Sequence, residues 1–231
     1  MNGISYSLDY DLGRDIWNWY YGANYSENGE EHFKNVDDLS VLKQIKGIKK
    51  LEDAEPILRP YLQSKSDDAE SELNGFLRVA NAQFAEYFQV ACEKMEEITD
   101  KPLANDRFTF YVTTFPRMVV FYEEGIVFLY AKIDDELWGM PLDGFMHELL
   151  HFQTDKYWRQ DPNSPVSGLS EDDYFRLKES LTVILDEELK PIITLPDCSY
   201  LEYGELREKL HDHWKKNHDF DALIGYGLGL L

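Results

Sequence analysis

Residues 141–152 read PLDGFMHELLHF and hold the pattern that decides the fold. Their apolar side chains recur three and four residues apart, as one face of an α-helix requires: Leu142, Phe145, Leu149 and Phe152. The run DPNSP at 161–165 is rich in residues that favour turns and end helices. The sequence therefore predicts a helix that begins after Pro141 and ends before Asp161.

Two histidines and a glutamate stand inside this predicted helix: His147, Glu148 and His151. Residues four apart lie one turn apart on the same helix face, so both imidazoles can point at one metal ion. Zinc accepts neutral imidazole nitrogens, and a catalytic zinc site combines three protein ligands with an open position for water. Glu148 flanks that face, where its carboxylate can act as a general base. The HExxH spacing therefore predicts zinc on His147 and His151, with Glu148 as the catalytic residue.

The segment Gly144–Phe152 resembles the active-site helix of the zincin metallopeptidases, and among them the gluzincins. The resemblance implies that a glutamate from a downstream helix serves as the third ligand. The residues after His151 read FQTDKY and lack the glycine and third histidine of the metzincin extension, which excludes that branch. Gln153 departs from the gluzincin pattern, in which this position is usually apolar.

Glu179 is the best match to the third ligand that the resemblance implies. It lies 28 residues after His151, on a helix predicted from the Ser170 cap to about Leu189. A turn-rich loop precedes that helix, so the two helices can bring Glu179 beside the histidines. A buried carboxylate without a partner is costly, and a metal would offset that cost.

Alternatives to Glu179 remain open. The other acidic residues of the same segment are rival ligands: Asp172, Asp173 and Asp186. Val183 stands where many gluzincins carry an acidic residue that orients a ligating histidine, and Asp186 is a candidate substitute. Glu179 itself can be read as an ordinary glutamate on a helix surface.

The rest of the chain predicts a small sheet among helices. β-branched and aromatic residues predict three neighbouring strands at 108–115, 118–122 and 126–130, which suggests an antiparallel sheet. Helices are expected over 36–62, with an end or kink at Pro60, over 66–98 and over 200–216. Residues 1–35 show no clear period, and the tail 219–231 stays unassigned. The predicted fold class is α+β, a mostly helical zincin-like domain with one small antiparallel sheet.

The expected organisation has a helical N-terminal part, residues 1–100, packed on or covering a zincin-like catalytic part, residues 101–231, in one continuous domain. The resemblance also implies an edge strand that holds an extended peptide. Gly125–Tyr130 is the candidate, because main-chain pairing there would add the substrate as a strand. An ordinary core strand is an equal alternative for the same residues.

A second histidine cluster follows near the C-terminus: His211, His213 and His218. His211 and His213 point to different sides of a helix and cannot easily share one metal. His211, His218 or Tyr203 could donate a hydrogen bond to the oxyanion that forms when water attacks a carbonyl. The alternative is a solvated helix face near a C-terminus, where cationic histidine is mildly favoured.

Composition excludes several classes of protein. The 44 acidic residues outnumber the 23 basic residues, for a formal net charge of −21. Such a field repels phosphate backbones and anionic lipids, so neither nucleic acid nor a membrane surface is an expected partner. Cys92 and Cys198 form no paired motif, which argues against a disulfide framework or a thiolate zinc site. No signal peptide or apolar span of ~18 residues is evident, so a cytoplasmic location is expected.

The sequence therefore predicts a zinc-dependent metallopeptidase that acts on a peptide or protein substrate. The main alternative is a catalytically silent metal-binding domain that binds a peptide or protein partner. Glu148 argues against it, because a silent site has no need of that carboxylate. A helical protein in which the motif arose by chance is the third hypothesis.

Overall fold

The computed structural model describes residues 4–25, 39–132, 140–190, 192–193 and 201–231. The fold is α+β, mostly helical, with one small four-stranded sheet. The chain divides into two compact units. We call Ser5–Ala82 with Arg107–Ile133 the sheet unit, and Met1–Ile4 with Gln83–Asp106 and Asp134–Leu231 the helical unit. The three predicted strands thus share a unit with the N-terminal segment, whereas we expected them with the motif helix.

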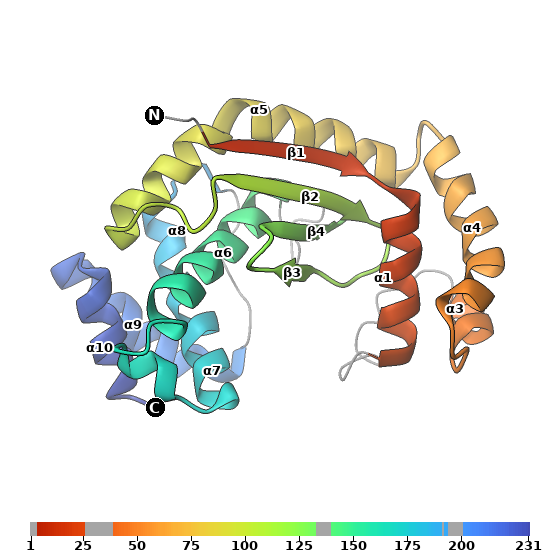
Figure 1. The fold of residues 1–231 in the computed structure, drawn as a ribbon. Coiled ribbons are helices and arrows are strands. Elements are labelled where there is room, and N and C mark those ends of the chain that lie inside the picture. Colours follow the sequence, from red (N-terminus) through yellow and green to blue (C-terminus); the bar gives the residue numbers. More distant parts are fainter. Residues whose placement is uncertain (1–3, 26–38, 133–139, 191, 194–200) are drawn as a thin grey trace. The chain divides into compact units, whose positions relative to one another are not determined.

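The sheet has the strand order β1-β2-β4-β3 and is mixed (Figure 1). β1 (Ser5–Tyr10) and β4 (Ile126–Tyr130) both run parallel to β2 (Arg107–Thr113). β3 (Val119–Phe121) runs antiparallel to β4. The three strands predicted from sequence are confirmed, but the expectation of an antiparallel sheet is wrong for two of the three pairings.

Two further expectations about the sheet are wrong. Residues 5–10 form a strand, whereas no regular element was expected there. The sequence shows no clear period because most of β1 is half-buried, and the strand depends on pairing with residues 102 positions later. β4 lies between β2 and β3, so Gly125–Tyr130 is not an edge strand. After β2 the chain forms β3 and then β4, which inserts between β2 and β3. The short β3 therefore lies at one edge of the sheet, and β1 lies at the other.

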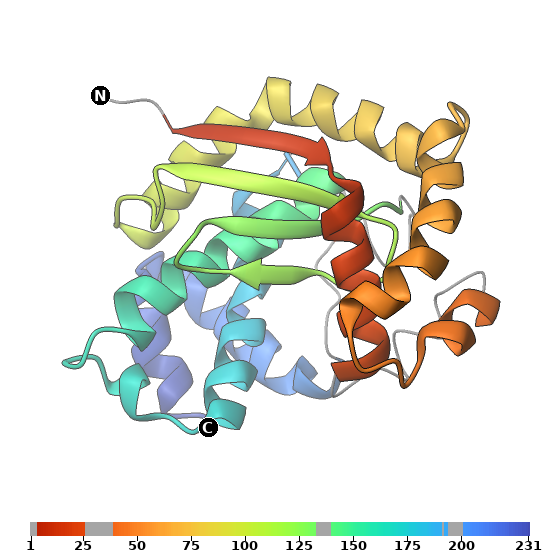
Figure 2. The ribbon, with the colours of Figure 1, turned by 45° about the vertical axis from the view of Figure 1, so that its right-hand side comes forward.

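Helices α1 (Leu12–Tyr25), α3 (Leu39–Ile45) and α4 (Leu51–Asp67) build the core of the sheet unit, and α1 and α4 lie side by side (Figure 2). Buried aromatic and aliphatic side chains join them, among them Trp19, Tyr20, Ile45 and Leu58. Gly22 lets the Phe115 ring approach α1, since a Cβ there would lie 2.1 Å from Phe115 Cε1.

α4 runs through both of its prolines, so the expected end or kink at Pro60 is wrong as a helix end. Pro56 and Pro60 are both exposed on the helix. Water can therefore hydrogen-bond the carbonyl groups that the missing proline N–H groups leave without partners. The helix predicted over 66–98 is present as α5 (Glu72–Thr99), but its predicted start is wrong, because residues 66 and 67 still belong to α4. The division between the two units falls within α5, after Ala82.

A buried carboxylate ties α1 to the end of β2 in the sheet unit. Asp15 is fully buried and accepts four hydrogen bonds. Oδ1 accepts from Thr113 Oγ1 at 2.6 Å and from Thr114 N at 2.9 Å. Oδ2 accepts from Thr114 Oγ1 at 2.8 Å and from the Tyr10 hydroxyl at 3.2 Å. Each oxygen of this carboxylate is thus satisfied within the unit.

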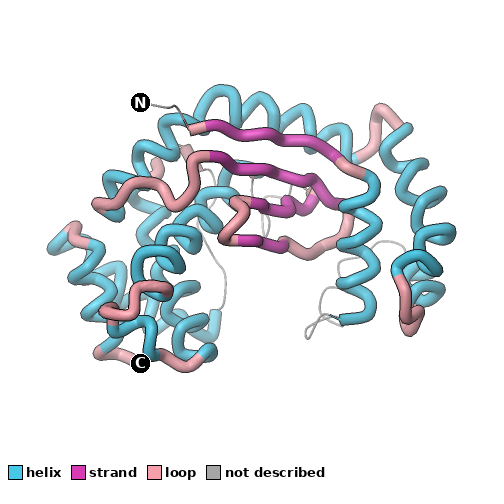
Figure 3. The backbone as a smooth tube through the Cα atoms, viewed as in Figure 1, coloured by secondary structure: helices cyan, strands magenta, loops and turns pink. Residues whose placement is uncertain are grey.

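The described part of the helical unit holds helices and loops without a strand, as the cyan segments of Figure 3 show. After α5 come α6 (Pro141–Thr154), a π-helical turn (Asp155–Arg159), a 3-10 turn (Pro165–Gly168), α7 (Glu171–Leu181), a 3-10 turn (Thr182–Ile184), α8 (Leu185–Glu188), a 3-10 turn (Leu201–Tyr203), α9 (Gly204–Asn217) and α10 (Phe220–Leu228). The helices expected around residues 142–152, 171–189 and 200–216 are confirmed. α10 occupies the tail that the sequence left unassigned. No helix in the described ranges is long and apolar enough to cross a membrane.

Candidate metal centre

α6 carries the HExxH residues on a well-anchored helix. Pro141 is its first residue, where a missing N–H is tolerated, and the Asp143 carboxylate accepts from Met140 N at 3.1 Å. The predicted apolar face is buried, and the Phe145 ring stacks on Phe88 of α5 with centroids 5.5 Å apart. These contacts fix the direction in which the opposite side of the helix presents its histidines.

The hydrogen bonds of Gln153 account for a polar side chain at a position that is usually apolar in the gluzincins. The side chain is fully buried and its amide oxygen accepts from Ala104 N at 2.6 Å. Its Nε2 donates to Thr99 Oγ1 and to the Pro102 carbonyl, both at 3.1 Å. The amide therefore ties α6 to the segment that follows α5, using both of its polar atoms.

α7 begins where the sequence predicted. Ser170 is the N-cap: its Oγ accepts from Asp173 N at 3.1 Å and donates to the Asp173 carboxylate at 2.8 Å. Arg159, at the end of the π-helical turn, organises the loop before this cap. Its Nη1 donates to the carbonyl oxygens of Val166 at 3.1 Å and Leu169 at 2.9 Å. The loop between α6 and α7 is thus held around one guanidinium group.

The structure brings His147, His151 and Glu179 together. His147 Nε2 lies 2.8 Å from His151 Nε2. Glu179 Oε2 lies 3.2 Å from His147 Nε2 and 3.3 Å from His151 Nε2. Among the described residues this is the one group of three or more His, Cys, Asp or Glu side chains arranged to hold a metal ion. The expected placement of Glu179 beside the two histidines is therefore confirmed.

The spacing of these three atoms suits a small cation. Ligand atoms at the usual zinc distances of about 2.0–2.2 Å in a tetrahedral site lie about 3.3–3.5 Å from one another. Two of the three observed separations, 3.2 and 3.3 Å, come close to that value, and the third is 2.8 Å. The two imidazoles and one carboxylate are also a donor set that zinc prefers.

Burial and protonation favour a cation at the same point. Glu179 is 4% exposed, and its Oε2 makes no hydrogen bond. Burial lowers the pKa of His151 to about 3, with a further contribution from the Lys178 charge, so this imidazole is neutral at pH 7. Burial alone would raise the pKa of Glu179, but the two histidines beside it hold it below its usual value. A carboxylate anion and a neutral imidazole are the protonation states that bind metal.

Two basic residues that the sequence analysis did not single out hold Glu179 in place. Lys178 Nζ lies 3.2 Å from Oε1, the carboxylate oxygen that is not turned to the histidines. Arg207 of α9 is buried, and its Nη1 donates to the Glu179 carbonyl at 2.8 Å and to Thr182 Oγ1 at 2.9 Å. Arg207 lies on the same apolar helix face as Leu210 and Trp214. A charged residue on such a face is unusual, and this signal in the sequence could have identified Arg207 as a candidate functional residue. Lys178 had no comparable signal.

The other acidic residues that the sequence offered as ligands are not members of this group. Asp173 caps α7, and none of Asp172, Asp173 and Asp186 belongs to the cluster. His211 Nε2 lies 3.2 Å from Glu187, and His218 Nδ1 lies 3.1 Å from Glu188. These two histidines thus contact glutamates that are not part of the cluster.

The predicted general base Glu148 and the predicted oxyanion donor Tyr203 are both half-buried. Glu148 follows His147 directly on α6. Tyr203 has a raised pKa, caused first by partial burial and then by the negative charges of Glu202 and Glu179. The charge of Glu179 therefore contributes to the raised pKa of Tyr203, one of the predicted oxyanion donors.

Comparisons with protein-family models, with curated proteins and with solved structures return no match for this chain. The geometry of the candidate metal centre is therefore the basis for a function.

Proposed function

We propose that this chain is a zinc-dependent hydrolase that cleaves peptide bonds, with the gluzincin-like ligand set His147, His151 and Glu179. The observation that carries the proposal is the buried Glu179 Oε2, which lies 3.2 and 3.3 Å from two imidazole nitrogens and makes no hydrogen bond. A buried carboxylate oxygen in that position is costly without a cation.

Each residue of the centre has a definite task. His147 and His151 present their Nε2 atoms, and Glu179 presents Oε2 while Lys178 holds its other oxygen. Zinc held there would acidify a water molecule and polarise the scissile carbonyl. Glu148 accepts the proton of the attacking water and returns it to the leaving amine. Arg207 keeps the backbone of α7 in register at Glu179.

Substrate class and location belong to the same proposal. The substrate is a peptide or protein, because the HExxH carboxylate serves amide hydrolysis in the zincins that the motif helix resembles. The net charge of −21 favours cations over anionic ligands, which suits a metal and disfavours phosphorylated substrates. The cytoplasm is the compartment that we propose.

The test is cleavage of a peptide library by the zinc-loaded chain, with Glu148→Gln as the decisive variant. We expect cleavage by the wild type and a rate about 100- to 10,000-fold lower for Glu148→Gln, with zinc content unchanged. Glu52→Gln, which alters an exposed glutamate of α4, is the matched control and keeps full activity. Zinc binding without cleavage by the wild type would instead identify a silent domain that binds a peptide or protein partner.

A further inference from the structure

The sheet unit contains a pocket of about 320 Å³, which the metal centre does not use. Its walls come from α1, α4, the start of α5 and the residues that end β2 and β4. The volume falls at the lower end of the range of about 300–1,000 Å³ that is typical of small-molecule sites. A ligand for this pocket is therefore small.

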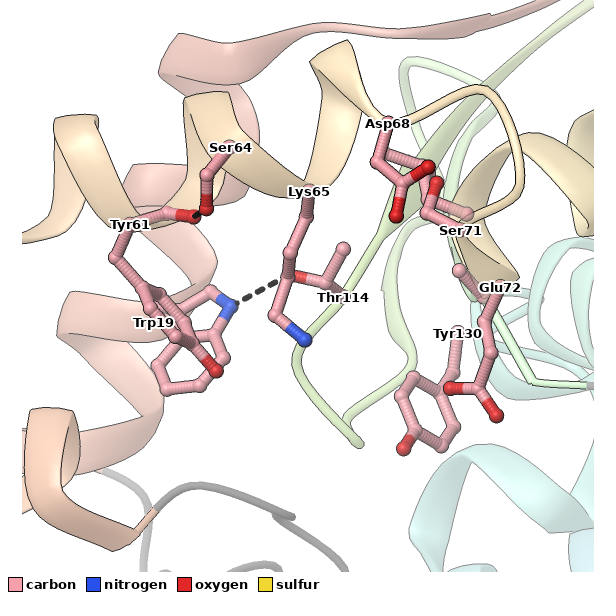
Figure 4. A pocket seen from close by; sticks show the side chains of 11 residues that line it. Trp19, Tyr61, Ser64, Lys65, Asp68, Ser71, Glu72, Thr114 and Tyr130 are labelled. Atoms are coloured by element: carbon pink, nitrogen blue, oxygen red, sulfur yellow. Dashed lines mark hydrogen bonds between the residues drawn. The ribbon is translucent and has the colours of Figure 1, made fainter.

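One wall of the pocket is aromatic and rigid. Trp19 is 1% exposed, and its Nε1 donates to Thr114 Oγ1 at 2.9 Å (Figure 4). The Tyr61 ring meets the Trp19 ring edge to face, with centroids 5.5 Å apart. Tyr130 of β4 adds a third ring to the lining. Because the Trp19 and Tyr61 rings are held by these contacts, they offer a preformed apolar surface.

A cation without an ion pair lies beside this wall. Lys65, in the last turn of α4, is half-buried, and its Nζ lies 5.2 Å from the centroid of the Tyr61 ring. It makes no ion pair with any residue in the described ranges. In Figure 4 the Lys65 ammonium group points into the space between Trp19 and Tyr130. An anionic group entering the pocket would meet it there.

Two carboxylates line the same pocket. Asp68 directly follows α4, and Glu72 is the first residue of α5. Figure 4 shows the Glu72 carboxylate beside Tyr130, across the pocket from Trp19. Neither carboxylate forms an ion pair with a described residue, although Lys65 lines the same pocket. Charges of both signs thus face one small space without meeting each other.

We infer that this pocket binds a small zwitterion with an apolar side chain, namely a free amino acid or a dipeptide. The carboxylate of the ligand would pair with Lys65, its ammonium group with Glu72 and Asp68, and its side chain would pack on the aromatic wall. A simple anion would face two carboxylates, and a simple cation would face Lys65, so a ligand with both charges fits best. This inference is independent of the zinc centre.

Isothermal titration calorimetry of the full chain in EDTA tests the inference, because removal of metal prevents hydrolysis of the ligand. The probes are L-leucine and leucyl-leucine, which separate the amino acid from the dipeptide. N-acetyl-leucine lacks the cation and leucinamide lacks the anion. We expect one of the two zwitterions to bind, and each of the two blocked compounds to bind at least about tenfold more weakly.

Lys65→Met and Glu72→Gln are each expected to weaken binding of the zwitterion by at least about tenfold. Lys43→Met, at an exposed lysine of α3, is the matched control and leaves binding unchanged. Absence of binding by both zwitterions, or binding that Lys65→Met and Glu72→Gln do not alter, would overturn the inference. Loss of zinc from the other site would leave these results as they are.

Discussion

Two buried carboxylates, one in each unit, have opposite surroundings. Asp15 in the sheet unit accepts four hydrogen bonds, three from hydroxyl groups and one from a backbone N–H. Glu179 in the helical unit has one oxygen beside Lys178 and another, Oε2, that accepts no hydrogen bond and faces two imidazole nitrogens. Both oxygens of the first carboxylate accept hydrogen bonds, whereas one oxygen of the second accepts none.

Under our proposal, the difference separates a structural carboxylate from a metal-binding one. Burial of an acidic side chain is costly in either case, and hydrogen bonds can offset that cost within the protein. At Asp15 the donors come from β1, β2 and the residue after β2, so the side chain stabilises the fold. At Glu179 the neighbours are metal ligands by type, which suits the cation that we propose for this site.

The largest expected effect is on folding. Asp15→Ala leaves the buried Thr113 hydroxyl and the Thr114 N–H without their acceptor, which should lower the free energy of unfolding by about 3–5 kcal/mol. Urea denaturation of the zinc-free protein measures it. Glu179→Gln keeps the side-chain shape and removes no hydrogen bond from Oε2, but it removes the charge that Lys178 faces, so we expect a smaller loss of about 1–2 kcal/mol. Equal losses of stability in the two variants would contradict the different roles that we assign to the two carboxylates.

The second effect is on zinc affinity. Glu179→Gln removes the charge of a proposed ligand and should weaken zinc binding by at least about 100-fold. Asp15→Asn makes the same chemical change at the other buried carboxylate and should leave zinc affinity unaltered. Competition with a chromophoric chelator measures both. A similar loss in Asp15→Asn would show that the effect spreads through the fold rather than acting at the centre.

The third effect is on how the free energy of unfolding depends on pH, which should have opposite signs for the two carboxylates. Burial raises the pKa of Asp15 above its ordinary value of 3.8, so the folded state binds this proton more tightly than the unfolded state does. Relative to Asp15→Asn, the wild type should therefore lose stability as the pH rises from below 3.8 through the raised pKa.

The zinc-free Glu179 site should behave in the opposite way. Its pKa is held below the ordinary 4.5, so its contribution is present above that value and is lost as the pH falls. Relative to Glu179→Gln, the wild type should lose stability on acidification below about pH 4.5. Denaturation series at several pH values test both signs, and slopes of the same sign would contradict the account.

Local patterns predicted much of the helical unit. The 3.6-residue period located α6, and the cap at Ser170 located α7 and hence Glu179. Contacts between distant residues could not be predicted in this way. β1 pairs with residues 102 positions later, and Asp15 reaches Thr113 across 98 positions. The parallel pairings of β2 follow from such contacts, as does the grip of Arg207 on Glu179 from a separate helix.

Metal content per chain shows whether His147, His151 and Glu179 hold zinc. The protein is purified without an affinity metal column, and its zinc is measured by elemental analysis for the wild type and for His147→Ala. We predict about one zinc per chain in the wild type and its loss in the variant. A wild type that holds no zinc, even after zinc is added back, would contradict the metal centre and the hydrolase built on it.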